Sequence, residues 1–354
     1  KDANGEKITS SVEFVAEDTD GSVDVKFNFD GTNLGGKILV AFEKLYYGEK
    51  LYGTHADLED EEQTMYVPEV ETVALNKETE THHALADGTV ELLDTVKYRN
   101  LLPGRNYTLH GMIVEKETGN PVSEERTLEF VPEKSEGSVE LGFEISADEL
   151  CGKTIVVYEE IKADGKSIAE HKDPEAKEQS IYFPEIGTKA LDENSKTQEG
   201  EAKEKQKIID QITYKNLLPD ETYVLKGVLM DKETGKELVD ENGKRVTAGI
   251  SFVPENEEGT IEMTFELDAR RLAGKSVVVF ERLYDEEEHL IAKEEDIENA
   301  DQTVLYRKQE IPKNTIVEKP GHNSKEVRKS PKTGDENRMD LWLVMLCAFG
   351  IAVV

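Results

Sequence analysis

The chain has 354 residues, of which 76 are Asp or Glu and 43 are Lys or Arg, so its formal net charge is −33. A charge of this sign argues against binding to nucleic acid or to an anionic membrane surface, because both attract basic proteins. The length is that of two or three domains.

Segments with alternating apolar residues recur three times along the chain, at residues 21–30, 137–146 and 259–268. Alternation predicts a strand that buries one face. A Gly-Lys pair and a mostly apolar run follow each segment, and every run ends in a glutamate, at Glu43, Glu159 and Glu281. Such a run is typical of a strand covered on both faces. The glutamates are 116 and 122 residues apart, which indicates an internal repeat.

A second motif, Tyr-x-Asn-Leu-Leu-Pro, begins at Tyr98 and again at Tyr214, also 116 residues apart. Each copy precedes an alternating segment, and turn signals such as Asp164-Gly165 and Asn242-Gly243 separate the predicted strands. Helical periodicity is scarce. These features predict an all-β fold of tandem Ig-like or CnaB-like β-sandwiches, with about 100 residues in each unit.

The period divides the apolar and polar segments into repeats. Residues 1–67 lack a counterpart of the second motif and are expected to be the C-terminal half of a truncated first repeat. The second and third repeats are expected at residues 68–183 and 184–307. The third is longer because the hairpin that follows Lys232 is longer than the one that follows Lys116, and an insertion at a hairpin tip leaves the strands intact.

The C-terminal part has a different composition. Residues 308–329 contain Pro312, Pro320 and Gly321 and are predicted to be a flexible linker. Residues 330–354 end in an uncharged apolar run that predicts a helix, shorter than the ~20 residues that span a bilayer. We interpret it as a truncated membrane segment. The alternative is a buried C-terminal helix of a globular domain.

Each repeat also carries polar residues at matching positions around a turn that ends in glutamine. They are Glu43, His55, Asp57, Asp60 and Gln63 in the first repeat, Glu159, His171, Asp173 and Gln179 in the second, and Glu281, Glu294, Asp296 and Gln302 in the third. The opening strands of the two complete repeats carry Thr72 and Thr188, which are 116 residues apart. A single Thr or Gln is normally an ordinary strand residue, but their recurrence in phase with acidic residues predicts a chemical site.

Together with Val-Ala-Phe-Glu at residues 40–43, this pattern resembles the VaFE repeats, the intramolecular Thr-Gln ester-bond domains of Gram-positive adhesins. In that family a Thr hydroxyl on the first strand attacks a Gln carboxamide on the last strand, and ammonia leaves. The resemblance therefore implies that Thr72 bonds to Gln179 and that Thr188 bonds to Gln302.

The resemblance also implies supporting roles for Glu159, Glu281 and His171, and we expect Asp173, Asp296 and Glu294 to assist; no cofactor or metal is expected. A Thr hydroxyl is a poor nucleophile and an amide a poor electrophile, so the pair reacts only when it is held together beside a base and an acid. Burial raises the pKa of a carboxyl group into the range in which it donates a proton.

The repeats differ around this predicted site. Ala176 and Asn299 replace the Asp60 of the first repeat, and Glu294 replaces the histidine in the third repeat, so its bond is the less secure. In the first repeat we expect the nucleophile strand to precede residue 1, which leaves Gln63 without its partner.

The Ser-Pro-Lys-Thr-Gly sequence at residues 330–334 resembles a cell-wall sorting signal read by a Gram-positive sortase. The resemblance implies cleavage between Thr333 and Gly334 and attachment of Thr333 to peptidoglycan, hence an extracellular, wall-anchored protein. Ser330 stands where such signals usually have Leu, and no basic tail follows. An exported protein should have a signal peptide, and none is visible, so we expect the chain to begin inside a larger protein.

The main interpretation is a wall-anchored, self-locked stalk that holds a distal host-binding domain, with sortase and peptidoglycan as partners. A ligand-binding adhesin module, whose repeats contact a host molecule directly without cross-links, is the alternative. A hydrolase that uses Thr, His and Glu is a third class, but it requires an open pocket and turnover.

Overall fold

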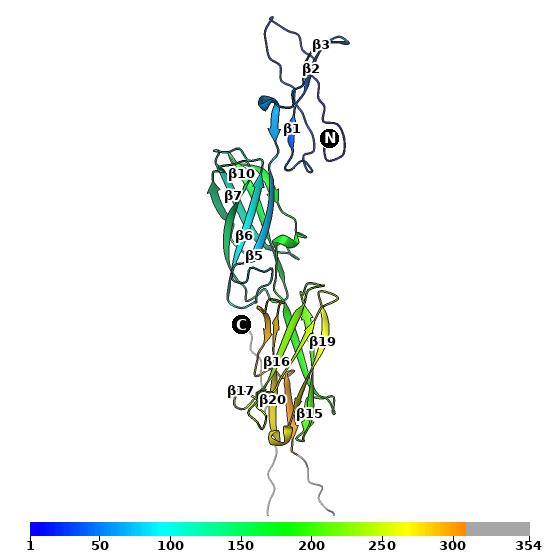
Figure 1. Cartoon of the computed structure of the whole chain (residues 1–354), viewed down its shortest axis with the longest axis vertical. Helices are drawn as coiled ribbons and strands as arrows, with labels where there is room; N and C mark the ends of the chain where they lie inside the picture. The colour runs from blue at the N-terminus through cyan, green and yellow to red at the C-terminus, as the bar shows by residue number, and fades with distance from the viewer. Residues whose placement is uncertain (309–354) are drawn as a thin grey trace, which may run out of the picture. The chain divides into compact units, whose positions relative to one another are not determined.

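The structure is a computed structural model that describes residues 1–308, and its regular elements are almost all β-strands (Figure 1). Within these residues the helical elements are short 3₁₀ turns, and no helix is long and apolar enough to cross a membrane. The prediction of an all-β fold of tandem sandwiches is therefore confirmed. The predicted linker and C-terminal helix lie outside the described residues.

The second repeat consists of two facing antiparallel sheets. One sheet has the order β5-β6-β9, with β5 at Glu69–Asn76, β6 at Thr89–Arg99 and β9 at Gly137–Ser146. The other has the order β11-β10-β7-β8, and β12 also pairs with β10. Its strands are β7 (Tyr107–Glu115), β8 (Arg126–Phe130), β10 (Thr154–Ala163), β11 (Lys166–His171) and β12 (Ser180–Tyr182).

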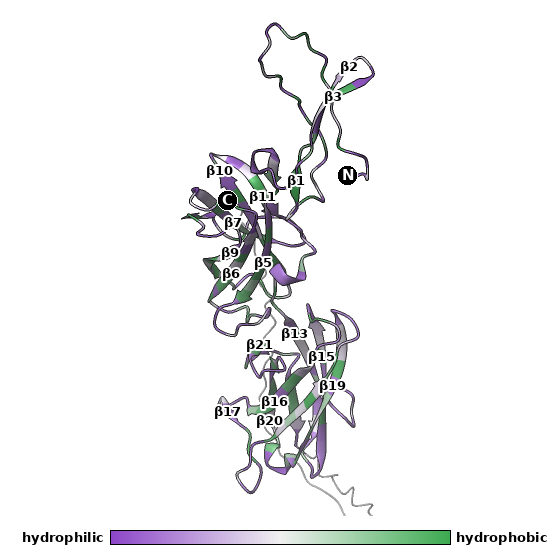
Figure 2. Ribbon diagram, turned by 45° about the horizontal axis from the view of Figure 1, so that its top comes forward, coloured by the Kyte–Doolittle hydropathy of each residue, from purple (hydrophilic) through white to green (hydrophobic). Residues whose placement is uncertain are grey.

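Apolar side chains from both sheets fill the space between them. Val96 and Phe143 from the first sheet are buried in one cluster with Leu109 and Ile155 from the second. The sheets approach closely at Gly111, where a Cβ atom would lie 2.4 Å from Leu141 Cδ2. Burial on alternate positions of β6 follows the alternation in the sequence. In Figure 2 the strands carry both hydrophobic and hydrophilic colour, whereas most loops are hydrophilic.

The third repeat has the same design. Its first sheet is β13-β15-β19, at Glu185–Asp192, Gln206–Lys215 and Gly259–Leu267. Its second sheet is β14-β22-β20-β16-β17, to which β18 and β21 add. These strands are β14 (Glu199–Glu201), β16 (Tyr223–Asp231), β17 (Lys236–Glu237), β18 (Thr247–Phe252), β20 (Lys275–Tyr284), β21 (Leu290–Glu294) and β22 (Thr303–Arg307). The insertion predicted after Lys232 contains β17.

The first repeat contains two small sheets, β1 (Ile38–Val40) with β4 (Thr64–Tyr66) and β2 (Glu43–Tyr47) with β3 (Lys50–His55). The strand predicted at residues 21–30 is wrong, because this segment has no regular structure. Its counterpart β9 pairs with β6 throughout its length, and residues 1–67 include no strand equivalent to β6. A strand needs such a partner for its backbone hydrogen bonds.

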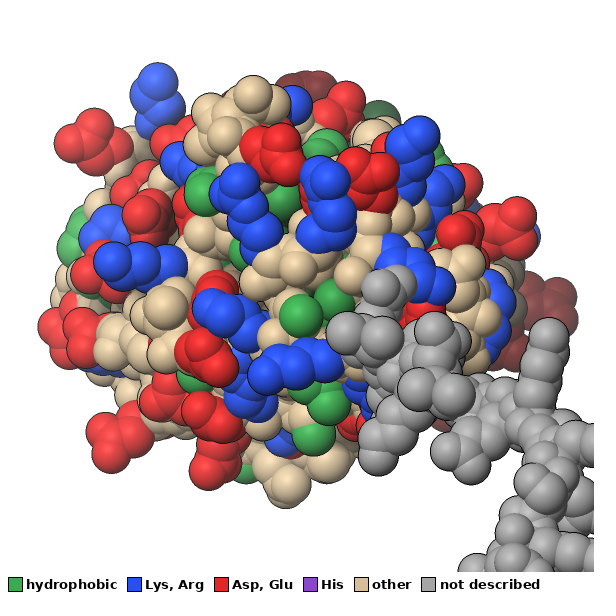
Figure 3. All heavy atoms as spheres, turned by 90° about the horizontal axis from the view of Figure 1, so that it is seen from below, with side chains coloured by type: hydrophobic (Ala, Val, Ile, Leu, Met, Phe, Trp, Pro, Cys, Tyr) green, Lys and Arg blue, Asp and Glu red, His purple; other side chains and the backbone are tan. Residues whose placement is uncertain are grey.

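The face seen in Figure 3 mixes Lys and Arg with Asp and Glu side chains, and hydrophobic side chains are scattered among them. Many of the charges are paired at the surface, as in the contacts of Arg270 with Glu204 and Glu241, 2.8 and 2.9 Å long. Exposed pairs of this kind add little to stability. Surface charge of this kind favours solubility. The fold is stabilised mainly by the apolar cores.

Candidate functional site

Thr72 lies on β5 with its side chain turned into the second repeat, where it is 4% exposed. Its hydroxyl donates a hydrogen bond to Glu159 Oε2 on the facing sheet, over 3.3 Å. It also lies 3.3 Å from His171 Nδ1. Glu159 and His171 are directly opposite each other on β10 and β11. Two neighbouring strands of one sheet thus present an acid and a base to a hydroxyl on the other sheet.

Gln179 completes this group from the end of the repeat. It closes the 3₁₀ turn η2 (Lys177–Gln179), and the next residue, Ser180, pairs with Val156 on β10. This pairing buries Gln179 fully, and its Nε2 donates to the same Glu159 Oε2 that accepts from Thr72. The structure therefore brings the predicted nucleophile and the predicted target to one oxygen atom.

Asp94 is a member of the site that the sequence analysis missed. It lies on β6 opposite Ala74 and is fully buried; neither of its carboxyl oxygens has a hydrogen-bond partner, and its charge acts on Glu159. A signal was present: Asp94 occupies an inward position of an alternating strand and recurs 116 residues later as Asp210. A buried carboxyl group in an apolar strand is rare unless it is paired.

Burial raises the pKa of both carboxyl groups, and the neighbouring Asp94 raises that of Glu159 further. Two carboxylates this close cannot both stay ionised in an apolar core, so the pair retains a proton near neutral pH. Burial acts in the opposite direction on His171, whose pKa it lowers, partly opposed by Asp173. The site therefore holds a proton donor and a neutral imidazole at the same time.

The third repeat repeats the geometry. The Thr188 hydroxyl donates to Glu281 Oε2 over 3.3 Å, and Gln302 Nε2 lies 2.6 Å from that oxygen and 2.9 Å from Thr188 Oγ1. Gln302, Glu281 and Asp210 are fully buried. Burial raises the pKa of Glu281 and of Asp210, and the charge of Asp210 raises that of Glu281 further.

Glu294 takes the position of the histidine in this repeat, because it pairs with Glu281 as His171 pairs with Glu159. Its carboxylate accepts a hydrogen bond of 3.4 Å from Asn299 Nδ2. In the described part of this repeat no hydrogen bond joins Glu294 to Thr188, whereas His171 lies beside Thr72. The two repeats therefore differ in the group that is next to the hydroxyl.

The structure does not bring Asp173 or Asp296 into these sites. Both are exposed, and each accepts a hydrogen bond of 2.9 Å from the backbone N–H two residues later. Asp57 does the same in the first repeat, over 3.0 Å. This is the common pattern by which an aspartate stabilises a turn. These aspartates occupy equivalent positions because each repeat has the same turn before its glutamine.

In the first repeat Gln63 and Glu43 are in contact. With the Gln63 amide turned so that its nitrogen faces the carboxylate, this nitrogen donates to Glu43 Oε1 over 2.8 Å. His55 lies opposite Glu43 and its Nε2 is 2.7 Å from Asp60 Oδ2. No threonine hydroxyl among residues 1–67 donates to the Glu43 carboxylate. This repeat holds the target side of the site and is half open, with His55 51% exposed.

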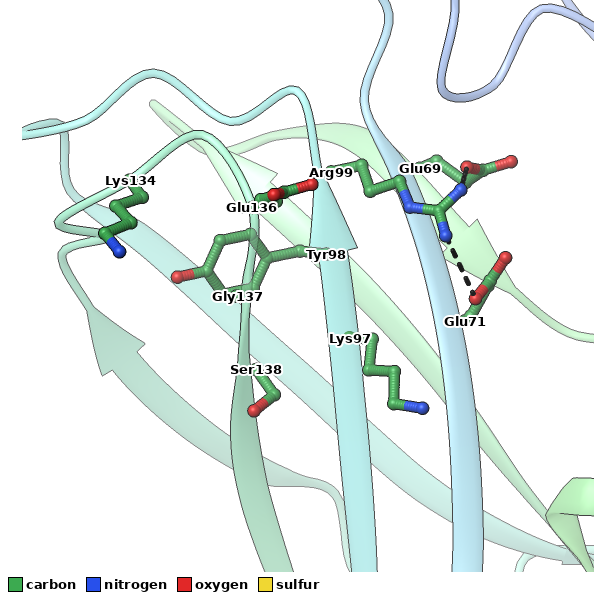
Figure 4. A pocket seen from close by; sticks show the side chains of 9 residues that line it. All are labelled: Glu69, Glu71, Lys97, Tyr98, Arg99, Lys134, Glu136, Gly137 and Ser138. Carbon is green, nitrogen blue, oxygen red and sulfur yellow. Dashed lines mark ion pairs between the residues drawn. The ribbon is translucent and has the colours of Figure 1, made fainter.

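A separate hollow of about 450 Å³ lies on the β5-β6-β9 sheet (Figure 4). Arg99 pairs there with Glu69 and Glu71 at 3.5 and 3.9 Å, and the ring of Tyr98 points the other way, toward Gly137. None of the reactive set lines this hollow. Among the described residues, no group of three or more His, Cys, Asp or Glu is arranged to hold a metal ion.

Comparison with known proteins agrees with this geometry. The family model of the T-Q ester bond containing domain matches residues 1–67, 68–183 and 184–306, so the chain belongs to this family. No curated protein matches the chain significantly.

The solved structures that match resemble the chain only weakly. One is a Mobiluncus mulieris adhesin described as containing intramolecular disulfide, isopeptide and ester bond cross-links, with 16% identity, a TM-score of 0.31, and coverage of 60% of this chain and 80% of that one. Another is the C-terminal domain of the Streptococcus agalactiae AgI/II polypeptide BspA, with 9% identity, a TM-score of 0.32, and coverage of 64% and 97%. A putative β-galactosidase of Bacteroides fragilis reaches 14% identity and a TM-score of 0.24, with coverage of 59% and 32%. Likenesses at this level carry no argument about function.

Proposed function

We propose that each complete repeat cross-links itself once, through an ester between Thr72 and Gln179 and another between Thr188 and Gln302. The observation that carries the proposal is the shared oxygen: Glu159 Oε2 accepts hydrogen bonds from both reacting side chains, and Glu281 Oε2 does the same in the third repeat. Membership of the T-Q ester bond family supports it.

In the second repeat the Thr72 oxygen attacks the Gln179 carboxamide carbon while His171 Nδ1, 3.3 Å from that oxygen, takes the hydroxyl proton. The pair formed by Asp94 and Glu159 donates its proton to the amide nitrogen, which contacts Glu159 Oε2. The carbon–nitrogen bond then breaks, and the nitrogen leaves as ammonia. The proton that His171 took from Thr72 returns to the carboxyl pair, so one ester and one ammonia are the products.

In the third repeat the same steps use Glu281 and Asp210 as the proton-donating pair. The proton of Thr188 passes to Glu281 or reaches the carboxylate of Glu294, which pairs with Glu281 across the two strands. Burial excludes water from both sites, because Gln179 and Gln302 are fully buried. Dryness protects the ester from hydrolysis once it has formed.

The cross-link joins the first strand of each sandwich to the segment that precedes its last strand. It closes a loop of roughly 100 residues, which in the chain-entropy model used for disulfides is worth about 4 to 5 kcal/mol. Tension that enters through the two ends of a repeat passes through this bond. We infer mechanical and protease resistance from this connection.

These properties fit the stalk of an extracellular, cell-wall-anchored adhesin. The sorting sequence at residues 330–334 makes sortase and peptidoglycan the proposed partners, with Thr333 joined to the wall. A host surface ligand is proposed to bind other domains of the adhesin rather than the repeats. The acidic charge of the chain disfavours nucleic acid as a partner.

The mass of the purified full chain tests the chemistry. We expect it to be lower than the sequence mass by one ammonia per bond, hence two when both bonds form, and digestion should give the peptides linked between Thr72 and Gln179 and between Thr188 and Gln302. Thr72→Ala should restore one ammonia and remove only the first linked peptide. Well-folded protein with the full sequence mass would contradict the proposal.

A further inference from the structure

The Tyr-x-Asn-Leu-Leu-Pro motif has no part in the cross-linking chemistry, yet it occurs in both complete repeats. Its asparagines, Asn100 and Asn216, directly follow β6 and β15 and have a positive φ of 59°. Asparagine tolerates this left-handed conformation better than most residues. The conformation ends the strand and turns the asparagine side chain toward the preceding repeat.

Asn216 of the third repeat binds the backbone of the second. Its Nδ2 donates to the carbonyl oxygens of Lys153 and Phe183, over 2.6 and 3.3 Å. Its Oδ1 accepts a hydrogen bond of 2.7 Å from Thr154 Oγ1. One half-buried side chain therefore makes three hydrogen bonds to a neighbouring sandwich.

The atoms that Asn216 binds belong to the two strands that build the reactive site of the second repeat. Lys153 immediately precedes β10, which carries Glu159, and Phe183 immediately follows β12, which begins just after Gln179. Backbone hydrogen bonds close the β10-β12 pair at this end: Phe183 N donates to Lys153 O over 3.0 Å, and Gly152 N donates to Phe183 O over 2.9 Å. Asn216 bridges the same two carbonyl groups from outside.

Asn100 makes the corresponding contacts to the first repeat. Its Nδ2 lies 3.3 Å from the Lys37 carbonyl oxygen and 3.0 Å from that of Val67. These residues flank β1 and β4, which pair as β10 and β12 do. The interaction is therefore a repeated feature, and in both cases it runs from one repeat to the strand that follows the glutamine in the repeat before it.

We propose that Asn216 is a positioning residue for the ester bond of the preceding repeat: it fixes β12 against β10, and so sets Gln179 against Glu159. This inference rests on the proposed function. It follows that the second repeat cross-links efficiently only when the third has folded beside it, so that bond formation is coupled along the chain. β12 has only three residues, and for such a short strand two added hydrogen bonds that bridge its end to the start of β10 are a large part of what holds it.

The test is the rate of each bond in the Asn216→Gly variant of the full chain, in timed samples from cell-free synthesis analysed for the two linked peptides. Glycine keeps the positive φ without strain, so only the side-chain contacts are lost. We expect the Thr72–Gln179 peptide to appear about five- to tenfold more slowly, which is the effect of about one net hydrogen bond. The Thr188–Gln302 peptide should appear at the normal rate and serves as an internal control.

Asn100→Gly is the matched control, because it removes the same side chain from the junction with residues 1–67; both linked peptides should then form normally. Asn216→Asp should behave like Asn216→Gly, because it keeps the acceptor for Thr154 and loses the donor. Equal slowing of both bonds in Asn216→Gly, or no slowing of either, would overturn the inference.

A second measurement does not depend on the chemistry. In a Thr72→Val background that cannot form the first bond, Asn216→Gly should increase hydrogen exchange at residues 180–183 and leave residues 303–307 unchanged. Unchanged exchange at residues 180–183 also overturns the inference. A wild-type chain without linked peptides would instead refute the proposed function, and the exchange measurement would still decide whether Asn216 holds β12.

Discussion

The carboxyl groups of Asp94 and Glu159 interact in the core of the second repeat, although Asp94 lies on β6 of one sheet and Glu159 on β10 of the other. Neither Asp94 oxygen has a hydrogen-bond partner. A buried acid pair of this kind destabilises the sandwich unless it holds a proton. The third repeat keeps the same arrangement in Asp210 and Glu281. The destabilising acid pair is therefore present in both repeats that are proposed to cross-link.

Asp94→Asn should slow formation of the Thr72–Gln179 bond by about 10²-fold or more, because the remaining carboxyl group then has no partner with which to share and donate a proton. The measurement is the yield of the linked peptide over time. Asp173→Asn is the matched control: this residue is exposed, binds a turn N–H and acts on the site only through its charge near His171, so the rate should change far less than in Asp94→Asn. Equal rates in wild type and Asp94→Asn would remove the acid pair from the mechanism.

The same pair makes the stability of the chain without cross-links depend on pH. The pKa values of these carboxyl groups are raised in the folded state. At a pH above the ordinary carboxyl pKa, the folded protein therefore binds more protons than the unfolded chain does. Stability contributed by this protonation is present at low pH and is lost as pH rises through the raised pKa values. We therefore expect the Thr72→Val, Thr188→Val double variant to lose stability between pH 7 and pH 9, by up to about 1.4 kcal/mol per pH unit for each proton released.

Above pH 7, titration of the buried histidines does not contribute to the loss of stability. Burial lowers the pKa of His83 to about 4, so it and His171 are neutral throughout that range. Glu159→Gln and Glu281→Gln added to the same background should flatten the dependence, as followed by denaturant unfolding at each pH. A slope that persists after both substitutions must come from groups other than these carboxyls.

Wall attachment depends on a different part of the chain. If sortase cleaves between Thr333 and Gly334, Thr333→Ala should leave the protein in the membrane fraction or release it to the medium, and the peptidoglycan fraction should lose it. The ester bonds should form normally in this variant, because both sites lie within residues 72–302. Wild-type levels in purified cell walls would contradict the sorting role.

Most of the reactive set could be predicted because the repeat period exposes it. Thr72 and Gln179 are unremarkable alone, but their recurrence as Thr188 and Gln302 marks them, and the structure brings each pair to a shared glutamate. Asp94 was missed because an acidic residue in an alternating strand normally faces water, and its burial depends on the facing sheet.

The remaining differences have the same origin in long-range contacts. Asp173 recurs at the repeat period like the reactive residues. It recurs because it stabilises the turn before the glutamine, and not because it takes part in the reaction. Residues 21–30 have the alternation of a strand but no neighbouring strand to pair with. Local pattern predicts what a segment can form, and the partner determines whether it forms.

His171 and Glu294 occupy equivalent positions, and exchanging them isolates the role of the imidazole. His171 Nδ1 lies 3.3 Å from the Thr72 hydroxyl and is neutral near pH 7, so it can accept that proton. Glu294 is directed to Asn299 instead, and it cannot become a cation on protonation. We expect the Thr188–Gln302 bond to form more slowly or less completely than the Thr72–Gln179 bond in the wild-type chain.

Glu294→His should accelerate the bond in the third repeat, and His171→Glu should slow the bond in the second. In each variant the untouched repeat is the control within the same molecule. Proton acceptance by a positioned side chain is worth about 10²-fold or more, so the exchange should reverse the order in which the two linked peptides appear. Should both peptides appear at equal rates in the wild-type chain, and should neither substitution change them, the proton of the threonine must pass directly to the buried carboxyl pair in both repeats.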